Sequence, residues 1–110
     1  MIKPPKEFLI DSFEYHEYEG VDDWSEPLFA PGVTIENVRI DRSVNYSVSN
    51  EKTVLYNGVI FCYEGLTEPL LDFKEQSKVH YDGQIKTLNR VVVNKEPFKD
   101  QVYSIELEVV

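Results

Sequence analysis

The chain has 110 residues, of which 42% are hydrophobic and 13% aromatic, and its formal net charge is −9 at pH 7. This length suits one domain with a modest core and excludes a large catalytic architecture with its own cofactor domain. The acidic balance disfavours non-specific binding to a nucleic-acid backbone. An acidic surface either favours a basic binding partner or only keeps the protein soluble. We expect a single domain over residues 1–110, in which residues 1–6 form an extended lead-in.

Cysteine usage and the N-terminus indicate where the protein is made. The single cysteine, Cys62, excludes an intrachain disulfide, which suits a reducing compartment. It lies in the apolar run of residues 59–63, so we expect a small buried side chain rather than a nucleophile. Residues 1–6 lack the apolar stretch of a signal peptide, and no segment approaches the length of a membrane span. Synthesis in the cytoplasm is expected.

The first third of the chain predicts a strand followed by a loop. Residues 8–18 favour a strand. Leu9, Phe13 and Tyr15 are separated by even numbers of residues, so in a strand their side chains point to the same face. Residues 19–32 are rich in turn formers. They also carry three large apolar residues, which are Trp24, Leu28 and Phe29. Such residues in a loop indicate either an internal satellite cluster or an exposed contact surface, and both alternatives stay open.

The middle of the chain predicts an interrupted strand and a long excursion. In the strand predicted at residues 33–41, Ile35 and Val38 are three residues apart, so in a regular strand they would point to opposite faces. A β-bulge near Glu36-Asn37 would return both to one buried face. Residues 43–56 contain Val44, Tyr46 and Val48 at alternating positions. Either residues 53–56 form a short strand between two turns, or residues 43–56 have only local order. A long polar loop indicates a role in contacts.

Two further elements precede the C-terminal third. The apolar run of residues 58–63 predicts a central strand buried on both faces. Residues 66–71 predict one helical turn, with Thr67 as its cap and Pro69 in its first turn.

Residues 79–110 predict a three-stranded meander. Asp82-Gly83 suits a two-residue hairpin turn, because both positions need a positive φ. The middle strand, residues 84–94, changes parity between Ile85 and Leu88, which indicates a bulge or strong twist. The last strand, residues 101–110, has an apolar face formed by Tyr103, Ile105, Leu107 and Val109. The whole pattern predicts an all-β fold: a small closed or partly open antiparallel barrel of about six strands, with long loops and at most one short helix.

No motif for catalysis is present. The chain lacks a Gly-rich phosphate loop, a cysteine pair with metal spacing and a nucleophile elbow. The acidic cluster around His16 comprises Glu14, Glu17, Glu19, Asp22 and Asp23. Its spacing matches no ligand pattern, so a solvated surface is favoured. His16 and His80 each lie on the polar face of a predicted strand, apart from one another, and both are expected to be exposed. We expect no enzyme, no catalytic or metal-binding residues and no cofactor.

Three segments carry a family resemblance. They are residues 72–83 (DFKEQSKVHYDG), residues 90–93 (RVVV) and residues 103–110 (YSIELEVV). In these segments, in length and in layout, the chain resembles the minor capsid proteins of tailed bacteriophages and prophages of Gram-positive bacteria, a group related to head-closure (stopper) proteins. It has Gln76-Ser77 where that pattern has Gly-Asp, and it lacks a His-Trp-Glu-like cluster in the last strand. The neck position (closure, adaptor or tail-proximal) therefore stays open.

The resemblance implies a structural virion protein of the neck. It would form a homo-oligomeric ring between the portal or adaptor and the tail-proximal proteins, while remaining a monomer or weak oligomer when purified alone. DNA would pass through the ring without sequence recognition, and residues 43–56 would gate the channel. The protein would reside in the host cytoplasm before assembly, with no membrane partner. Candidate interaction residues are Trp24, Leu28, Phe29, Val44, Tyr46 and Val48. The alternative is a small β-barrel adaptor that binds a peptide or carbohydrate in a concave aromatic groove.

Overall fold

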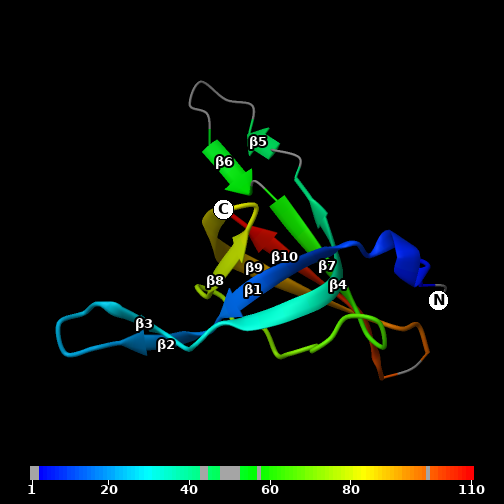
Figure 1. Cartoon of the computed structure of the whole chain (residues 1–110), viewed down its shortest axis with the longest axis horizontal. Coiled ribbons are helices and arrows are strands. Elements are labelled where there is room, and N and C mark those ends of the chain that lie inside the picture. Colours follow the sequence, from blue (N-terminus) through cyan, green and yellow to red (C-terminus); the bar gives the residue numbers. More distant parts are fainter. Residues whose placement is uncertain (1–2, 43–44, 48–52, 57, 99) are drawn as a thin grey trace.

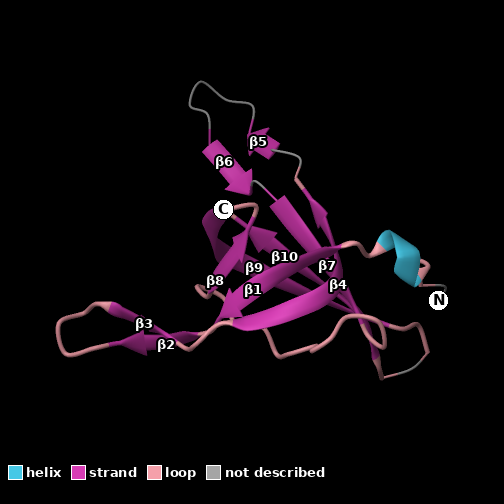
Figure 2. Ribbon diagram, in the orientation of Figure 1, coloured by secondary structure: helices cyan, strands magenta, loops and turns pink. Residues whose placement is uncertain are grey.

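The computed structural model describes residues 3–42, 45–47, 53–56, 58–98 and 100–110, and for residues 45–47 and 53–56 it describes the backbone alone. Six antiparallel strands form a closed barrel in the order β1-β4-β7-β10-β9-β8 (Figure 1). These strands are β1 (Asp11–His16), β4 (Val33–Asp41), β7 (Gly58–Tyr63), β8 (Lys78–Tyr81), β9 (Gln84–Lys95) and β10 (Val102–Val109). The predicted all-β barrel is confirmed. In the described residues the only helical element is the 3-10 turn η1 (Lys6–Phe8), so no helix there could cross a membrane (Figure 2).

Two hairpins extend from the barrel. One is formed by β2 (Tyr18–Val21) and β3 (Pro27–Phe29), and connects β1 to β4. The other is formed by β5 (Asn45–Ser47) and β6 (Thr53–Tyr56), and connects β4 to β7. Because β4 runs from the first hairpin to the second, they leave opposite ends of the barrel (Figure 1). The prediction of one strand over residues 8–18 and a plain loop over residues 19–32 is therefore wrong in part: the chain divides at Glu17, and the loop pairs with itself.

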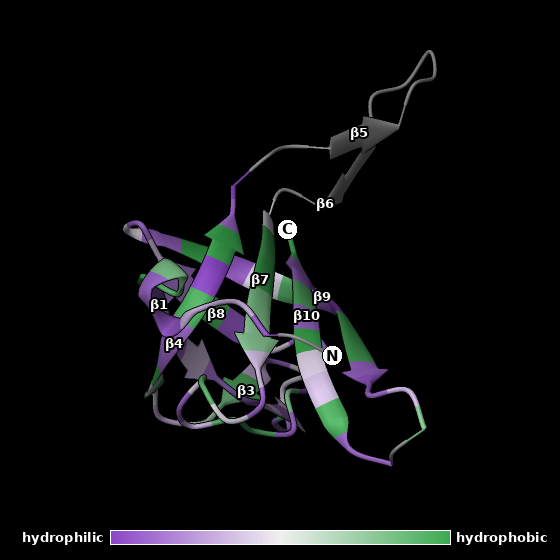
Figure 3. Ribbon diagram, turned by 90° about the vertical axis from the view of Figure 1, so that its right-hand side faces the viewer, coloured by the Kyte–Doolittle hydropathy of each residue, from purple (hydrophilic) through white to green (hydrophobic). Residues whose placement is uncertain are grey.

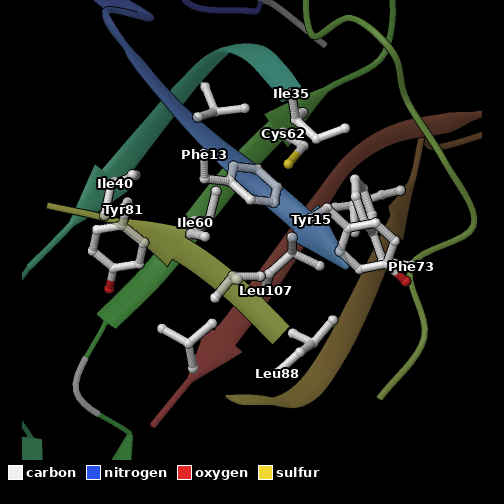
Figure 4. Close-up of a cluster of buried hydrophobic side chains, with 14 residues drawn as sticks. Phe13, Tyr15, Ile35, Ile40, Ile60, Cys62, Phe73, Tyr81, Leu88 and Leu107 are labelled. Carbon is white, nitrogen blue, oxygen red and sulfur yellow. The ribbon is translucent and has the colours of Figure 1, made fainter. Parts of the chain in front are cut away.

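The core lies inside the barrel, and alternate residues of each strand contribute to it (Figure 4). Phe13 and Tyr15 are both 2% exposed, as their shared parity predicted. Phe73, from the segment before β8, covers them: its ring lies 5.1 Å from that of Tyr15, edge to face, and 6.2 Å from that of Phe13. Such aromatic pairs add to the free energy of burial.

A β-bulge in β4 resolves the parity conflict seen in the sequence. Asp11 pairs with Val38 and Ser12 with Glu36, so Asn37 is the extra residue. Its φ is +61°, a conformation that Asn tolerates better than most residues. Ile35 and Val38 are consequently both fully buried. The predicted bulge is confirmed.

The meander follows its prediction at the turn and differs from it in the middle strand. Asp82 and Gly83 have φ values of +54° and +71° between the paired residues Tyr81 and Gln84, as the two-residue turn requires. In β9, Arg90 pairs with Glu108 but Leu88 pairs with Val109, so a bulge lies at Asn89. It was predicted between Ile85 and Leu88, where the pairing with β8 is regular and Ile85 is exposed.

The predicted helical turn over residues 66–71 is wrong. The Thr67 hydroxyl accepts a hydrogen bond from the Tyr63 amide and donates one to the Asn37 carbonyl. Glu68 forms an isolated bridge with Glu36. The Thr67 side chain therefore ties this segment to the bulge of β4 instead of capping a helix.

Two predictions of burial need correction. In β7, Gly58, Ile60 and Cys62 are buried while the alternate residues are only partly so. A barrel wall has one inner face, so the prediction of a strand buried on both faces is wrong; the same alternation of hydropathy is visible along β4 (Figure 3).

In β10, Tyr103 was predicted on the apolar face of the strand. A register shift at Tyr103 instead turns its ring toward that of Tyr63, with the ring centroids 6.0 Å apart, while Val102 packs against the core.

Candidate interaction surface

The β2–β3 hairpin presents large apolar side chains to solvent. It extends away from the barrel (Figure 1), and its Trp24 is 84% exposed. Val21 and Leu28 are also exposed. The internal-cluster alternative is therefore wrong for Trp24 and Leu28. An isolated exposed apolar residue is ordinary, but three on one short hairpin are typical of a contact surface.

The turn of this hairpin is held by its own hydrogen bonds. Asp22 Oδ1 accepts from the amides of Trp24 (2.8 Å) and Glu26 (2.9 Å). The Asp22 amide donates to the Glu26 carbonyl, and Ser25 occupies the left-handed region with φ +62°. A short Asp side chain favours such a turn because it can accept from amides that follow it. Trp24 is thus displayed from an ordered turn.

The base of the hairpin is attached to the barrel. The rings of Tyr18 and Phe29 lie 5.9 Å apart, with the Lys74 ammonium over the first and the Lys78 ammonium over the second. The Ser77 hydroxyl, which is buried, accepts from the Tyr18 amide. Phe29, a predicted interaction residue, therefore packs at the base of the hairpin.

The charge of this hairpin has one sign. Residues 17–32 contain five acidic side chains and no Lys or Arg; the five are Glu17, Glu19, Asp22, Asp23 and Glu26. An aromatic side chain framed by carboxylates complements a surface that is apolar at its centre and basic at its edge.

The second predicted contact segment lies mostly outside the described residues. Val44 and Val48 fall there, and Tyr46 lies in β5, where only the backbone is described. The pairing of Ser47 with Thr53 shows that residues 53–56 form a short strand, which was one of the two alternatives.

An ion-pair cluster stands where the chain leaves β4 for the β5–β6 hairpin. Arg42 Nε donates to Asp82 Oδ2 (2.6 Å) and Arg42 Nη2 donates to Asp11 Oδ1 (3.0 Å). The hydrogen bond from Arg42 lowers the pKa of the Asp82 carboxyl. The guanidinium therefore joins β1, the end of β4 and the β8–β9 turn.

A groove on the opposite side of the barrel from the β2–β3 hairpin was missed by sequence reasoning. It has a volume of about 250 Å³ and is lined by Pro4, Phe8, Leu9, Arg39 and Tyr63. The N-terminal η1 turn beside it and the hairpin lie at opposite sides of Figure 1. No local signal could reveal the groove, because its walls come from the lead-in, β4 and β7.

Sequence reasoning also separated two histidines that the fold brings together. β1 pairs with β8 so that Glu14 lies opposite His80. The rings of His16 and His80 stack with their centroids 4.5 Å apart. The prediction that each histidine stands alone is therefore wrong, and both are partly buried.

Residues 5–109 match the family model described as minor capsid protein. The chain belongs to the minor capsid protein family. Comparisons with curated proteins and with solved structures gave no match. This minor capsid protein is therefore a structural protein of the bacteriophage virion, as the resemblance of its C-terminal segments implied. Membership of a structural family favours a non-catalytic role.

Proposed function

We propose that this minor capsid protein acts at the phage neck, in a homo-oligomeric ring that joins portal or adaptor to tail-proximal proteins and closes the head after DNA packaging. The observation that carries this proposal is the placement of the Trp24 hairpin and the Arg39 groove on opposite sides of one barrel. A projection on one side and a recess on the other permit head-to-tail contacts. Contacts of this kind generate rings when the rotation closes.

The two surfaces are chemically complementary. Trp24 supplies a large apolar ring at the tip of an acidic hairpin. The groove offers Phe8 and Tyr63 as apolar walls and Arg39 as a basic edge. Tryptophan and arginine are the side chains most often found to dominate binding at interfaces. In the proposed ring, Trp24 of each subunit occupies the groove of the next.

The size of the contact suits assembly on a template. One hairpin tip buries a small area, so the isolated protein remains a monomer or weak oligomer. A ring on the portal makes each subunit contact effectively intramolecular, which multiplies a weak affinity. The net charge of −9 would repel DNA passing along the channel, in keeping with passage without sequence recognition. In this proposal residues 43–56 lie toward the channel.

Substitution of Trp24 tests the role of the hairpin. In a phage whose gene for this protein is deleted, a plasmid copy with Trp24→Ala is expected to yield DNA-filled heads joined to tails at least about tenfold less often than the wild type, because a tryptophan anchor commonly dominates binding. Phe98→Ala is the matched control, since Phe98 is a fully exposed aromatic residue on the β9–β10 connection. Electron microscopy and plaque counts measure the result. Equal yields from Trp24→Ala and wild type would contradict the proposal.

A charge exchange tests the pairing of hairpin and groove. Asp23→Arg and Arg39→Glu are each expected to reduce assembly, because each places like charges together. The double variant restores opposite charges and is expected to recover most of the yield. Additive losses in the double variant would show that the two surfaces do not meet.

The adaptor alternative receives less support. Trp24 is exposed, as an adaptor would need, but it stands at a projecting tip rather than in a recess. Two surface cavities of the described residues, the Arg39 groove and one lined by Glu64, Leu70, Gln101 and Val102, do not include it.

A further inference from the structure

Three side chains with metal-ligating atoms meet where the barrel closes. Glu14 and His16 lie two residues apart on β1, and therefore on one face of it, and His80 lies opposite Glu14 on β8. One carboxylate oxygen and one nitrogen from each ring lie within 4.8 Å of one another. All three point outward from the barrel wall, since the residues that alternate with them on β1 and on β8 are buried.

The hydrogen bonds of His16 orient it as a ligand. Its Nδ1 lies 3.1 Å from the Ala30 carbonyl and donates to it, which leaves Nε2 facing Glu14 Oε1. A backbone carbonyl that holds the far nitrogen of an imidazole is the usual outer partner of a metal-binding histidine. His80 Nδ1 lies 4.0 Å from the same Glu14 oxygen. Zinc–nitrogen bonds are about 2.0–2.1 Å long, so the three atoms lie close enough for one ion once the hydrogen bond between His16 and Glu14 is replaced by bonds to the metal, which displaces the Nε2 proton.

The backbone makes room for the carboxylate. A β-carbon at position 32 would lie 2.5 Å from Glu14 Oε1 and 2.7 Å from Glu14 Cδ. Only the absence of a side chain at Gly32 lets the Glu14 carboxylate occupy its place beside His16. A residue far from β8 in sequence thus shapes the same cluster.

We propose that Glu14, His16 and His80 bind a divalent transition-metal ion such as Zn²⁺. Two imidazoles and one carboxylate select zinc, nickel or copper over calcium and magnesium, which prefer oxygen ligands. The Glu14 side chain is 48% exposed, so water or a donor from a neighbouring subunit completes the coordination. The neighbouring Lys78 does not occupy the site, because its ammonium donates to Thr87 Oγ1 at 2.8 Å and lies over the Phe29 ring.

The ion would reinforce two features at once. It would join β1 to β8, the pair of strands that closes the barrel and that comes from distant parts of the sequence. Through the bond from His16 to Ala30, it would also hold the exit of the β2–β3 hairpin. Metal binding is thereby linked to the stability of the barrel.

Calorimetry on the full chain without a polyhistidine tag, stripped of metal by a chelator, tests the site. We expect one Zn²⁺ to bind per chain and Ca²⁺ to bind far more weakly. Glu14→Gln and His80→Gln are each expected to weaken zinc binding at least about tenfold. Glu19→Gln is the matched control: it removes the same charge from the neighbouring hairpin and should bind zinc as the wild type does. Gly32→Ala should also weaken binding, although it removes no ligand.

Thermal unfolding gives a second readout. Zinc should raise the Tm of the wild type and of Glu19→Gln but not of His80→Gln, because a ligand that binds the native state stabilises it. Circular dichroism checks that each variant folds, and if His80→Gln does not fold, Glu14→Gln carries the same comparison. Absence of zinc binding by the wild type would overturn the proposal. So would equal affinity for Ca²⁺, or a loss in Glu19→Gln as large as that in Glu14→Gln, since the acidic hairpin would then hold the ion.

Discussion

At the scale of single residues, Tyr81 and Gly58 form a tight contact near the end of the barrel. The Tyr81 hydroxyl is buried and has no hydrogen-bond partner among the described residues. Burial raises the pKa of Tyr81, the nearby Asp82 carboxylate adds to the rise, and Arg42 opposes it. A β-carbon at position 58 would lie 2.6 Å from this hydroxyl. The two residues therefore constrain each other.

Substitutions at this contact should be coupled. Gly58→Ala is expected to lower the free energy of unfolding by roughly 1–3 kcal/mol through overpacking. Tyr81→Phe should change it by less than about 1 kcal/mol, because the hydroxyl lacks a described partner. In the double variant, loss of the hydroxyl should recover part of the cost of the added methyl. Urea denaturation measures the free energy of unfolding of the two single variants and of the double variant. A large loss in Tyr81→Phe alone would reveal a partner for the hydroxyl.

Cys62 is a second residue whose behaviour follows from burial. It is fully buried in β7, and burial raises the pKa of its thiol to about 12. The thiolate is the reactive form, so the native protein should react with a thiol reagent at pH 8 only as fast as it unfolds. In denaturant the reaction should be immediate. Rapid labelling of native protein, followed by absorbance, would contradict the placement of Cys62 in the core.

At the scale of elements, the bulge of β4 depends on one side chain. Asn37 combines a positive φ with a hydrogen bond from its Nδ2 to the Leu66 carbonyl (3.1 Å). Its own carbonyl accepts from Thr67. The bulge thus keeps both halves of β4 facing the core and also anchors the segment that follows β7.

Variants at Asn37 separate backbone conformation from side-chain bonding. Asn37→Ala loses the bond to Leu66 and places a poorly suited residue at positive φ, so we expect a loss of about 1–3 kcal/mol. Asn37→Gly loses only the bond and should cost less. Asn89→Ala is the control, since Asn89 is an exposed Asn at the bulge of β9 and has no positive φ. Thermal or urea unfolding measures the stability of the three variants. Equal stability of Asn37→Ala and Asn89→Ala would contradict the role given to Asn37 in the bulge of β4.

At the scale of the whole molecule, closure of the barrel relies on contacts between distant segments. The clamp of Arg42 on Asp11 and Asp82 links the end of β4 to β1 and to the β8–β9 turn. All three groups are at least partly exposed, so salt weakens their attraction. The Asp82 carboxylate, whose pKa Arg42 lowers, nevertheless makes stability depend on pH.

Asp82→Asn isolates this dependence, because Asn accepts the positive φ of the turn as readily as Asp. Arg42 lowers the pKa of Asp82 in the folded state. The stabilisation is therefore complete above the unfolded pKa of about 3.9 and is lost as the pH falls through the lower folded pKa. The variant should have a lower Tm than the wild type at pH 7, and the difference should shrink as the pH falls below the unfolded pKa. A difference that persists unchanged at pH 2 would assign it to the turn instead of the charge.

The sequence by itself determined what depends on neighbours along the chain. The parity of Phe13 and Tyr15, the Asp82-Gly83 turn and the change of parity around Asn37 predicted the barrel, because side-chain direction in a strand has a fixed period and positive φ favours few residues. The same local patterns, with the resemblance of the C-terminal segments, were sufficient to indicate the family.

Only the tertiary structure decided which distant residues meet. The β1–β8 pairing brings His80 to Glu14 and His16. The pairing of β4 with β7 brings Arg39 and Tyr63 together with the lead-in to form the groove. The local pattern predicted a helix at Thr67, but bonds to Tyr63 and Asn37 prevailed there. These contacts have one physical reason in common. Strand register and long-range hydrogen bonds are fixed by the cooperative burial of a shared core, whereas a short stretch of sequence contains only one of the two residues in each such contact.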